Sequence, residues 1–533
     1  MSGTFGELRP DHFHSGLDFS TQNKENLEVL ASADGYVSRI KISSGGYGKV
    51  IYLTHPNGFV TVYAHLNAFN VVVDDYVKRK QYEQKSFEIE LFPNPALFKI
   101  KKGDIIGYSG NSGASGGPHL HFEIRNTRTE IPINPLYSGI YPIGKEKIVI
   151  EKLALYPFGT NSLINGQNKK VILETSKTKR DTSLKVSDTI RVEGNIFFGM
   201  EAYQKTNADD SWGLYAEEIR IDSMPFFRIS FDSVSFDDWR YVNTLKDYET
   251  YNSTNAKIIQ TYIAPGNRLK IYSSPRNKGF YFFCDTNYHV VTFIAEDIFG
   301  NKASQKLIVK SATPLQKTVS TKTDFPLYHY GLKEHFEAKN ITVDFPENAL
   351  YDSIYFDYKV TDGNRKTYSV IHQVQDANTP IHSYVLVKIK PNIPFTDSIK
   401  PKLCMARFSN NTYSYVKSEW TDGYISAKIH TFGNYCIVAD TTPPEIKPLG
   451  NLNHKKINPD ELIRFTISDN FSGIDTYTLT LNGKWILADY DAKNDLLTYK
   501  ADAANFVKGN NDLKLVVTDK LKNQQTISLT LVY

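Results

Sequence analysis

The chain has 533 residues, 41% of them hydrophobic and 23% charged, with a formal net charge of +4 and a pI near 8.5. This composition is that of a globular protein and excludes a largely disordered chain, while so slight a charge argues against a nucleic-acid binder. The length exceeds the roughly 250 to 300 residues at which one hydrophobic core stops growing, so we expect about three or four domains. Aromatic residues reach 13%, which favours β-sheet over helix.

Short strand-like runs, separated by glycine, asparagine and aspartate turns, fill the chain from Phe5 to about Gly144. The turn Pro56-Asn57-Gly58 joins two of them and is typical of a hairpin. We expect strands at 35–40, 49–53 and 60–63.

The stretch 70–100 is longer and more charged than its neighbours. We interpret it as an insertion between two strands of the first domain, partly helical around Lys80 to Phe87. Such an insertion would wall one side of a site in this domain and narrow its specificity.

Strand patterns continue to the C-terminus and divide into further modules. The run 290–295 with the turn Asp297–Asn301 resembles the last hairpin of bacterial immunoglobulin-like modules, and the linker Thr441-Thr442-Pro443-Pro444 marks a boundary. We expect a mainly β protein, with an antiparallel β domain followed by about three β-sandwich modules, the second and fourth units immunoglobulin-like. The expected units are 1–144, 145–310, 311–440 and 441–533.

The cysteines Cys284, Cys404 and Cys436 are odd in number and form no CxxC pair, so a cysteine metal site is not expected. Cys404 and Cys436 either pair across neighbouring strands or serve as small buried hydrophobic residues. No run of about 18 apolar residues occurs, so no transmembrane segment is predicted. No signal peptide precedes the motif region that begins soon after Met1, so we expect that a leader was removed and that Met1 need not be native.

Five residues in the first domain form the parts of a mononuclear zinc hydrolase: His14, Asp18, His65, His119 and His121. Imidazole and carboxylate groups suit Zn²⁺, and a catalytic zinc keeps about three protein ligands and one open position. Three of the five could bind the metal, which would leave two imidazoles for proton transfer.

The spacing of these residues favours strands rather than a helix. His119 and His121 are two apart, which places both on one face of a strand. The helical HExxH motif is absent, and with it the usual glutamate base, so a histidine is the available base. Taken singly, a histidine in the position of His65 is more often a core or rim residue than a functional one, and HxH also occurs on plain strands. The combination in this order favours a metal site.

Residues 5 to about 140 resemble the lysostaphin-type (LytM-like) zinc metallopeptidases, whose fold is of the duplicated hybrid motif type. The resemblance implies that His14, Asp18 and His121 are the ligands of one zinc ion and that His119 and His65 are the catalytic imidazoles. It rests on three segments: Phe5-Gly6-Glu7-Leu8-Arg9 to His14-Ser15-Gly16-Leu17-Asp18, Tyr63-Ala64-His65-Leu66, and Gly110-Asn111-Ser112-Gly113 to Pro118-His119-Leu120-His121-Phe122-Glu123.

The activity that the resemblance implies is zinc-assisted hydrolysis of peptide bonds in bacterial peptidoglycan, with His119 as general base and His65 as hydrogen-bond partner of the water or the oxyanion. Arg9, His12 and Gly117 are weaker candidates for substrate binding. His55, beside the Pro56-Asn57-Gly58 turn, is expected to be structural.

Two other functions stay open. The chain could be a non-catalytic member that binds the wall or regulates amidases, although such members usually lack zinc ligands. It could also be a surface adhesin or scaffold dominated by its β-modules. We expect peptidoglycan peptides as substrate, a periplasmic or cell-surface location, and C-terminal modules that bind envelope proteins or restrict access to the site.

Overall fold

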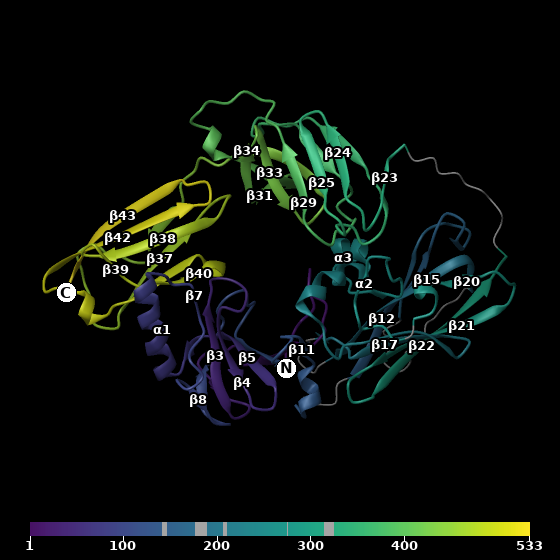
Figure 1. The fold of residues 1–533 in the computed structure, drawn as a ribbon, viewed down its shortest axis with the longest axis horizontal. Coiled ribbons are helices and arrows are strands. Elements are labelled where there is room, and N and C mark those ends of the chain that lie inside the picture. The colour runs from purple at the N-terminus through teal and green to yellow at the C-terminus, as the bar shows by residue number, and fades with distance from the viewer. Residues whose placement is uncertain (141–146, 176–188, 206–210, 274, 314–323) are drawn as a thin grey trace.

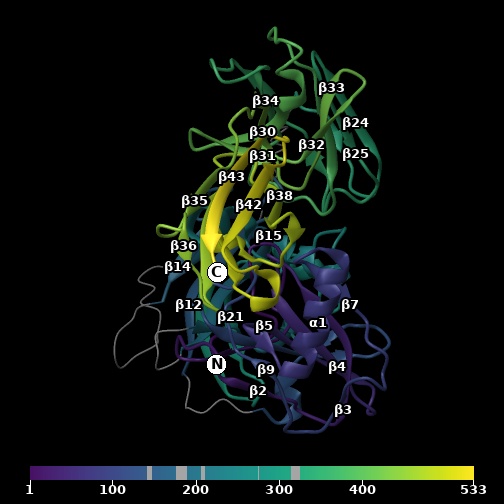
Figure 2. The ribbon, with the colours of Figure 1, turned by 90° about the vertical axis from the view of Figure 1, so that its left-hand side faces the viewer.

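The computed structural model describes residues 1–140, 147–175, 189–205, 211–273, 275–313 and 324–533. It is mainly β, as predicted, with strands in every part of the chain and few helices. Figure 1 shows the chain running around a ring, so that the C-terminal module lies beside the N-terminal domain, and Figure 2 shows the same arrangement from the side. We refer to residues 1–140 as the N-terminal domain and to 147–313, 324–440 and 441–533 as the second, third and fourth modules.

The N-terminal domain is built on one antiparallel sheet in the order β1-β10-β5-β4-β3-β7, with β11 beside β10 and β8 beside β3. A small second sheet has the order β2-β9-β6. The strands are β1 (Leu17–Ser20), β2 (Glu28–Leu30), β3 (Gly35–Ile42), β4 (Lys49–Thr54), β5 (Phe59–Leu66), β6 (Ala68–Phe69), β7 (Ile89–Leu91), β8 (Lys99–Ile100), β9 (Ile105–Tyr108), β10 (His119–Asn126) and β11 (Pro132–Ile133).

The strands β3, β4 and β5 confirm the three strands predicted from the sequence, and β4 and β5 form the predicted hairpin. The helix of the 70–100 stretch was predicted too late in the chain, because α1 spans Val71–Gln84. Asn70 caps its first turn, accepting a hydrogen bond from the backbone N–H of Val73, and Lys85 ends it in a left-handed conformation. The capping residues Asn70 and Lys85, rather than the charged character of the stretch, set the ends of this helix.

The second module contains one connected sheet in the order β14-β12-β15-β22-β21-β17-β18, in which β15 and β22 run parallel. Four short strands also pair with β15. The elements are β12 (Lys147–Pro157), β13 (Leu163–Ile164), β14 (Val171–Glu174), β15 (Ile190–Lys205), β16 (Ser211–Trp212), β17 (Ala216–Ile221), β18 (Met224–Ser230), α2 (Val242–Leu245), α3 (Tyr248–Thr254), β19 (Ile259–Gln260), β20 (Tyr281–Phe283), β21 (Tyr288–Glu296) and β22 (Lys302–Ser311).

The third module packs two five-stranded sheets around a common core, in the orders β24-β25-β29-β33-β32 and β27-β28-β34-β30-β31. A two-stranded sheet, β23-β26, accompanies them. The strands are β23 (Leu327–Tyr328), β24 (Glu334–Ala338), β25 (Ile341–Phe345), β26 (Ile354–Tyr355), β27 (Tyr358–Thr361), β28 (Ile371–Val374), β29 (Val385–Ile389), β30 (Leu403–Ser409), β31 (Thr412–Val416), β32 (Ser418–Thr421), β33 (Tyr424–Ile429) and β34 (Gly433–Ala439).

The fourth module is also a sandwich, with sheets in the orders β35-β37-β41-β40 and β36-β43-β42-β38-β39. Its strands are β35 (Glu445–Pro448), β36 (Lys455–Lys456), β37 (Leu462–Ser468), β38 (Ile474–Leu481), β39 (Lys484–Trp485), β40 (Asp489–Asp491), β41 (Leu496–Lys500), β42 (Asn510–Asp519) and β43 (Gln524–Val532). The immunoglobulin-like character of the second and fourth units stays a prediction.

The first and second units share a hydrophobic core. Phe5, Leu8, Phe13 and Leu17 are at most 4% exposed and belong to the same buried cluster as the strands of the second module. The expected boundary after residue 144 lies outside the described residues. Apolar side chains at the start of the chain therefore join the N-terminal domain to the second module.

The ring closes through contacts between the fourth module and the N-terminal domain. Lys49 and Lys78 form ion pairs with Asp489 and Asp502, at 2.9 and 3.0 Å, and Tyr477 and Tyr490 are among the side chains that pack against the core of the N-terminal domain. Lys493 donates hydrogen bonds to the backbone carbonyls of Asn111 and Gly113. The module thus touches the loop that precedes β10.

The cysteines are free thiols in the structure. Cys404 on β30 and Cys436 on β34 are buried, and burial raises the pKa of each thiol to about 12. Of the two alternatives, the structure agrees with Cys404 and Cys436 as small buried hydrophobic residues. No helix among the described residues is long and apolar enough to cross a membrane.

Candidate metal centre

Adjacent strands bring the predicted site residues together. Asp18 on β1 lies directly opposite His121 on β10, and His121 lies opposite Ala64 on β5, the residue before His65. His119 and His121 point to one side of β10, because both imidazoles approach Asp18 Oδ1, at 3.5 and 3.0 Å. The shared strand face expected from the spacing of two is therefore present.

His14 reaches the same point from the segment that precedes β1. Its backbone exchanges hydrogen bonds with the carbonyl of Glu7 and the N–H of Gly6, which fixes the loop against the start of the chain. Gly16, between His14 and Asp18, is required by packing, since a Cβ there would lie 2.2 Å from the Phe122 carbonyl oxygen.

His14, Asp18 and His121 form a compact triangle of donor atoms. His14 Nε2, Asp18 Oδ1 and His121 Nδ1 are each 3.0 Å from the other two. The second nitrogen of each ring is already engaged, because His14 Nδ1 donates to the Thr4 carbonyl at 2.7 Å and His121 Nε2 donates to Glu123 Oε1 at 2.8 Å. In the neutral tautomers the nitrogens that face the triangle carry lone pairs.

This triangle fits a zinc ion. Ligand bonds of about 2.0 to 2.1 Å in a tetrahedron place neighbouring donor atoms about 3.3 Å apart, close to the separations observed here. One carboxylate and two imidazoles, each imidazole held by an acceptor on its far nitrogen, are also the ligand chemistry that zinc prefers. Three converging ligand atoms, one of them the oxygen of a carboxylate, favour a cation between them.

The pKa shifts of Asp18 and His121 agree with a bound cation. Although burial alone would raise it, the surrounding imidazoles of His119, His121 and His14 hold the pKa of Asp18 far below its usual range. Burial opposes protonation of His121, yet Asp18 and Glu123 raise its pKa to about 9. The site therefore attracts positive charge.

The two remaining histidines lie beside the triangle: His119 Nε2 is 3.5 Å from Asp18 Oδ1, and the ring centroid of His65 is 5.9 Å from that of His121. His119 Nδ1 donates to the Gly117 carbonyl at 2.8 Å, and His65 Nδ1 donates to the Ser112 carbonyl at 2.8 Å. The ring centroids of His65 and His119 are 4.8 Å apart. Burial, with the neighbouring His121 and His119, lowers the pKa of His65 to about 3, so its Nε2 carries a lone pair.

Sequence reasoning missed a buried charge network behind His121. Glu123, fully buried, accepts from His121 Nε2, from Ser15 Oγ at 2.6 Å and from Tyr47 Oη at 2.5 Å, and its other oxygen accepts from Arg125 Nε at 2.6 Å. Burial would raise its pKa, but Arg125 and His121 hold the pKa far below the usual range. The spacing that pairs His119 with His121 continues to Glu123, and this alternation was the available signal.

Two of the weaker candidates, Arg9 and Gly117, lie at the edge of the site. Arg9 pairs with Glu7 at 3.0 Å and with Asp18 Oδ2 at 3.2 Å, so it contacts the second oxygen of a triangle residue. His12 bonds Asp11 and lies 4.9 Å from the ring of Trp239, away from the triangle. Gly117 contributes its carbonyl to His119.

His55 is engaged on both ring nitrogens and lies outside the site. Its Nδ1 bonds the Asp34 carbonyl at 2.8 Å and its Nε2 bonds Thr61 Oγ1 at 2.7 Å. At 5% exposure it is a buried link between loop and strand.

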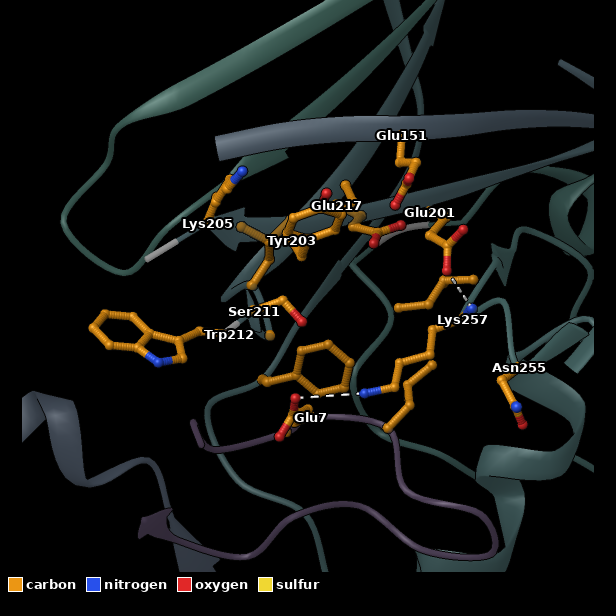
Figure 3. A pocket seen from close by; sticks show the side chains of 17 residues that line it. Glu7, Glu151, Glu201, Tyr203, Lys205, Ser211, Trp212, Glu217, Asn255 and Lys257 are labelled. Carbon is orange, nitrogen blue, oxygen red and sulfur yellow. Dashed lines mark hydrogen bonds and ion pairs between the residues drawn. The ribbon is translucent and has the colours of Figure 1, made fainter. Parts of the chain in front are cut away.

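A separate cavity of about 390 Å³ lies between the start of the chain and the second module (Figure 3). Glu7, Glu201, Glu217 and Lys257 are among its lining residues, and none of the triangle residues lines it. Burial and the nearby Glu201 raise the pKa of Glu217 well above its usual value. The cavity and the triangle are therefore distinct features.

Comparisons with known proteins match two parts of the chain. Residues 12–82 and 98–135 match peptidase family M23, and residues 326–440 match the Zu5-like domain. The gap in the first match falls within the stretch predicted to be an insertion.

Curated relatives match the first quarter of the chain. The DD-carboxypeptidase/endopeptidase Mpg of Neisseria meningitidis serogroup B is 33% identical over 123 residues, which are 23% of this chain and 22% of the relative. The glycyl-glycine endopeptidase ALE-1 of Staphylococcus capitis is 32% identical over 111 residues, 21% of this chain and 24% of the relative. The chain thus spans about a fifth to a quarter of the length of these relatives.

The match to a solved structure is also limited to about a quarter of this chain. The catalytic domain of lysostaphin from Staphylococcus simulans is 24% identical, with a TM-score of 0.19, and the match covers 25% of this chain and 87% of that domain.

Proposed function

Residues 12–82 and 98–135 form a peptidase family M23 domain, and from this premise we propose that the chain is a zinc-dependent endopeptidase of bacterial peptidoglycan, cutting peptide cross-links or bridges. The observation that carries the proposal is the triangle of His14, Asp18 and His121 with two further imidazoles turned toward it. A DD-carboxypeptidase/endopeptidase and a glycyl-glycine endopeptidase among the relatives support a peptide substrate.

In this proposal His14 Nε2, Asp18 Oδ1 and His121 Nδ1 hold one zinc ion per chain. Zinc in such a site supplies Lewis-acid chemistry, which lowers the pKa of a water toward about 7 and polarises a carbonyl. Glu123 keeps His121 in the tautomer that offers Nδ1, and the Thr4 carbonyl does the same for Nε2 of His14.

His119 is proposed as the general base. Its Nδ1–H is held by Gly117, so Nε2 is free to accept a proton from the attacking water. At 16% exposure its side chain is more open to solvent than that of His121, at 5%. The imidazolium formed in this way then donates the proton to the leaving amine.

His65 is proposed to act beside it. With Nδ1–H held by Ser112, its Nε2 accepts a hydrogen bond from the water and orients it. One such positioned hydrogen-bond partner contributes about 10² to 10³ in rate. His119 thus moves the proton, while His65 orients the water.

The complete donor set favours this function over a wall-binding member without activity, since such members need neither the triangle nor the two facing imidazoles. We propose a periplasmic or cell-surface location because the proposed substrate lies there. We also propose that the third and fourth modules bind other proteins of the cell envelope.

Digestion of purified peptidoglycan tests the proposal. The full chain with one equivalent of zinc is expected to release peptide fragments, identified by mass spectrometry, and a chelator is expected to abolish release. Loss of fragments with His121→Ala, together with loss of bound zinc, agrees with the proposal. Zinc-independent release, or no release from any peptidoglycan type, contradicts it.

A second pair of variants separates binding from catalysis. His119→Ala is expected to keep one zinc ion per chain while kcat falls by about 10² to 10⁴. His335→Ala is the matched control, because His335 is a half-exposed histidine of the third module that pairs with Asp344. Equal activity of His119→Ala and His335→Ala would remove His119 from the mechanism.

A further inference from the structure

A second group of acidic side chains lies at the junction of the third and fourth modules. Asp440 follows β34, Asp469 follows β37, and Asp519 is the last residue of β42. One carboxylate oxygen from each lies within 4.8 Å of the other two. The chain thus brings together three anions from segments far apart in the sequence.

These carboxylates are largely removed from water. Asp519 is fully buried and Asp440 is 3% exposed. Within the described part of the chain, no lysine, arginine or histidine forms an ion pair with any of the three. Three carboxylates this close together, two of them buried, repel one another unless a cation or protons compensate them.

The lysines near this junction are directed elsewhere, and Lys522 pairs with Asp475. Lys402 Nζ donates to the Leu521 carbonyl at 2.9 Å. Lys520 Nζ lies over the ring of Tyr415, 5.5 Å from its centroid. None of these ammonium groups neutralises the carboxylate group.

An unpartnered hydroxyl points independently to a missing ligand. Ser472 is 2% exposed, and its Oγ has no hydrogen-bond partner. Its backbone N–H donates to Asp440 Oδ2 at 3.2 Å, which places Ser472 next to one of the three carboxylates. Asp469 Oδ1 is likewise buried without a partner. Buried polar atoms without partners are rare and costly in native proteins.

The remaining carboxylate oxygens are held in place by backbone and amide donors. Asp469 Oδ2 accepts from the N–H groups of Phe471 and Gly473, at 3.0 and 2.8 Å. Asp519 accepts from the backbone N–H and the side-chain amide of Asn523, both at 2.7 Å. These bonds orient the carboxylates while leaving lone pairs available, which is the construction of an ion site rather than of an ion pair.

We propose that Asp440, Asp469 and Asp519, with the hydroxyl of Ser472, bind one calcium ion. The donors are all oxygen, and neither imidazole nor thiolate takes part, which favours a hard cation over zinc. Calcium accepts six to eight oxygen ligands in flexible geometry, whereas magnesium demands a near-ideal octahedron and retains several waters. Several converging carboxylates in a buried pocket therefore fit calcium better.

The position of the site gives the ion a structural role. Asp440 follows the last strand of the third module, while Asp469 follows β37 and Asp519 ends β42 in the fourth module. Around it, Phe471 and Leu521 pack against the apolar face that includes Cys404 and Cys436. The ion fixes the angle between these modules, and with it the docking of the fourth module on the N-terminal domain.

Equilibrium dialysis of the full chain against ⁴⁵Ca²⁺ tests the proposal. The expected result is one bound calcium ion per chain, retained in His121→Ala, which places the ion away from the zinc triangle. Asp469→Asn is expected to weaken calcium affinity roughly tenfold or more, because one charged ligand is lost. Failure to bind calcium at millimolar concentration, or equal affinity of Asp469→Asn and the parent chain, overturns the proposal.

Two further variants guard against a folding artefact. Ser472→Ala removes an unpaired buried hydroxyl, so in calcium-free buffer its thermal midpoint is expected to equal or exceed that of the parent, while its calcium affinity falls. Asp475→Asn is the matched control, because Asp475 lies at the start of β38 near the site but pairs with Lys522, and its substitution is expected to leave calcium affinity unchanged. Unchanged affinity in Ser472→Ala, or weakened affinity in Asp475→Asn equal to that of Asp469→Asn, contradicts the assignment.

Discussion

Asp18 of β1 lies directly opposite His121 of β10, with Asp18 Oδ1 and His121 Nδ1 3.0 Å apart. Opposed residues of an antiparallel pair project from the same face of the sheet, so the register of two strands places two of the three proposed zinc ligands. A slip of one residue would turn Asp18 to the other face. The metal centre therefore depends on the pairing of β1 with β10.

Gly16 is expected to control this pairing. A Cβ at Gly16 would lie 2.2 Å from the Phe122 carbonyl oxygen, which belongs to β10 and cannot move without breaking the sheet. Gly16→Ala is expected to destabilise the N-terminal domain by about 1 to 3 kcal/mol through overpacking and to lower zinc occupancy. Thermal unfolding and metal analysis of the purified variant measure both effects.

Gly45→Ala is the control for that substitution. A Cβ at Gly45 meets nothing within 4 Å, and its φ is not in the left-handed region. This variant is expected to keep the thermal midpoint and the zinc content of the parent. If Gly16→Ala behaved like Gly45→Ala, the close approach of β1 to β10 would not exist in solution.

The spacing of two between His119 and His121 predicted their shared strand face, and this part of the centre was accessible to sequence reasoning. The partnership of Asp18 with His121 was not, because the two residues are 103 positions apart and nothing local sets the register of β1 against β10. Only the family resemblance joined them. The roles of the five residues stay proposals that the substitutions test.

Glu123 is expected to tune the metal centre through His121. It accepts the Nε2–H of His121 and is itself paired with Arg125, so it fixes both the orientation and the tautomer of the ring. Glu123→Gln is expected to weaken zinc affinity by about 10- to 100-fold while kcat at saturating zinc falls less. Competition with a chromophoric chelator measures the affinity.

Glu90→Gln provides the comparison, because Glu90 is a partly exposed glutamate that pairs with Arg39 and Lys41 on the far strands of the same sheet. Its zinc affinity is expected to match that of the parent. An unchanged affinity in Glu123→Gln would mean that the contact to His121 has no influence on the metal.

His65 combines a proposed catalytic ring with an unusual backbone. Its φ of 58° lies in the left-handed region, which costs most side chains about 1 kcal/mol and which asparagine tolerates better. His65→Asn is therefore expected to fold as stably as the parent, to keep zinc, and to lose about 10² to 10³ in kcat. Kinetics on a defined cell-wall peptide would show this, and full activity of His65→Asn would refute the proposed role.

The domain organisation shows where strand patterns stop being informative. The sequence placed strands and linkers, but not the burial of Phe5, Leu8, Phe13 and Leu17 against the second module. Those residues read as ordinary core of a first domain, and only the tertiary arrangement reveals that their partners lie beyond it. The N-terminal domain therefore does not carry its complete core.

A fragment of residues 1–140 is expected to be unstable or aggregation-prone. Exposing its four apolar side chains costs about 1.5 to 3 kcal/mol each, and the Thr4 carbonyl that orients His14 lies in the same segment. A fragment of residues 1–440, which keeps the shared core, is expected to stay soluble and to bind zinc. Size-exclusion chromatography and metal analysis compare them, and a stable, zinc-loaded 1–140 fragment would contradict the shared core.

Lys246 is expected to make stability depend on pH. It is fully buried, donates to the Pro10 carbonyl at 2.6 Å and lies 3.7 Å from the ring centroid of Tyr251. Burial lowers its pKa to about 8, with Lys257 adding to the effect and Asp11 opposing it.

The direction of this pH dependence follows from the number of protons bound by the folded and unfolded chains. The unfolded chain, with a lysine pKa of about 10.4, binds more protons than the folded chain between about pH 8 and 10, so stability from this residue rises with pH across that window. Below about pH 8 both states are protonated, and the cost of the buried charge is fully present. Lys246→Met keeps the length of the side chain and removes the charge. The urea midpoint of the parent is therefore expected to rise relative to that of Lys246→Met between about pH 7 and 10, and a constant difference would show that Lys246 stays protonated throughout.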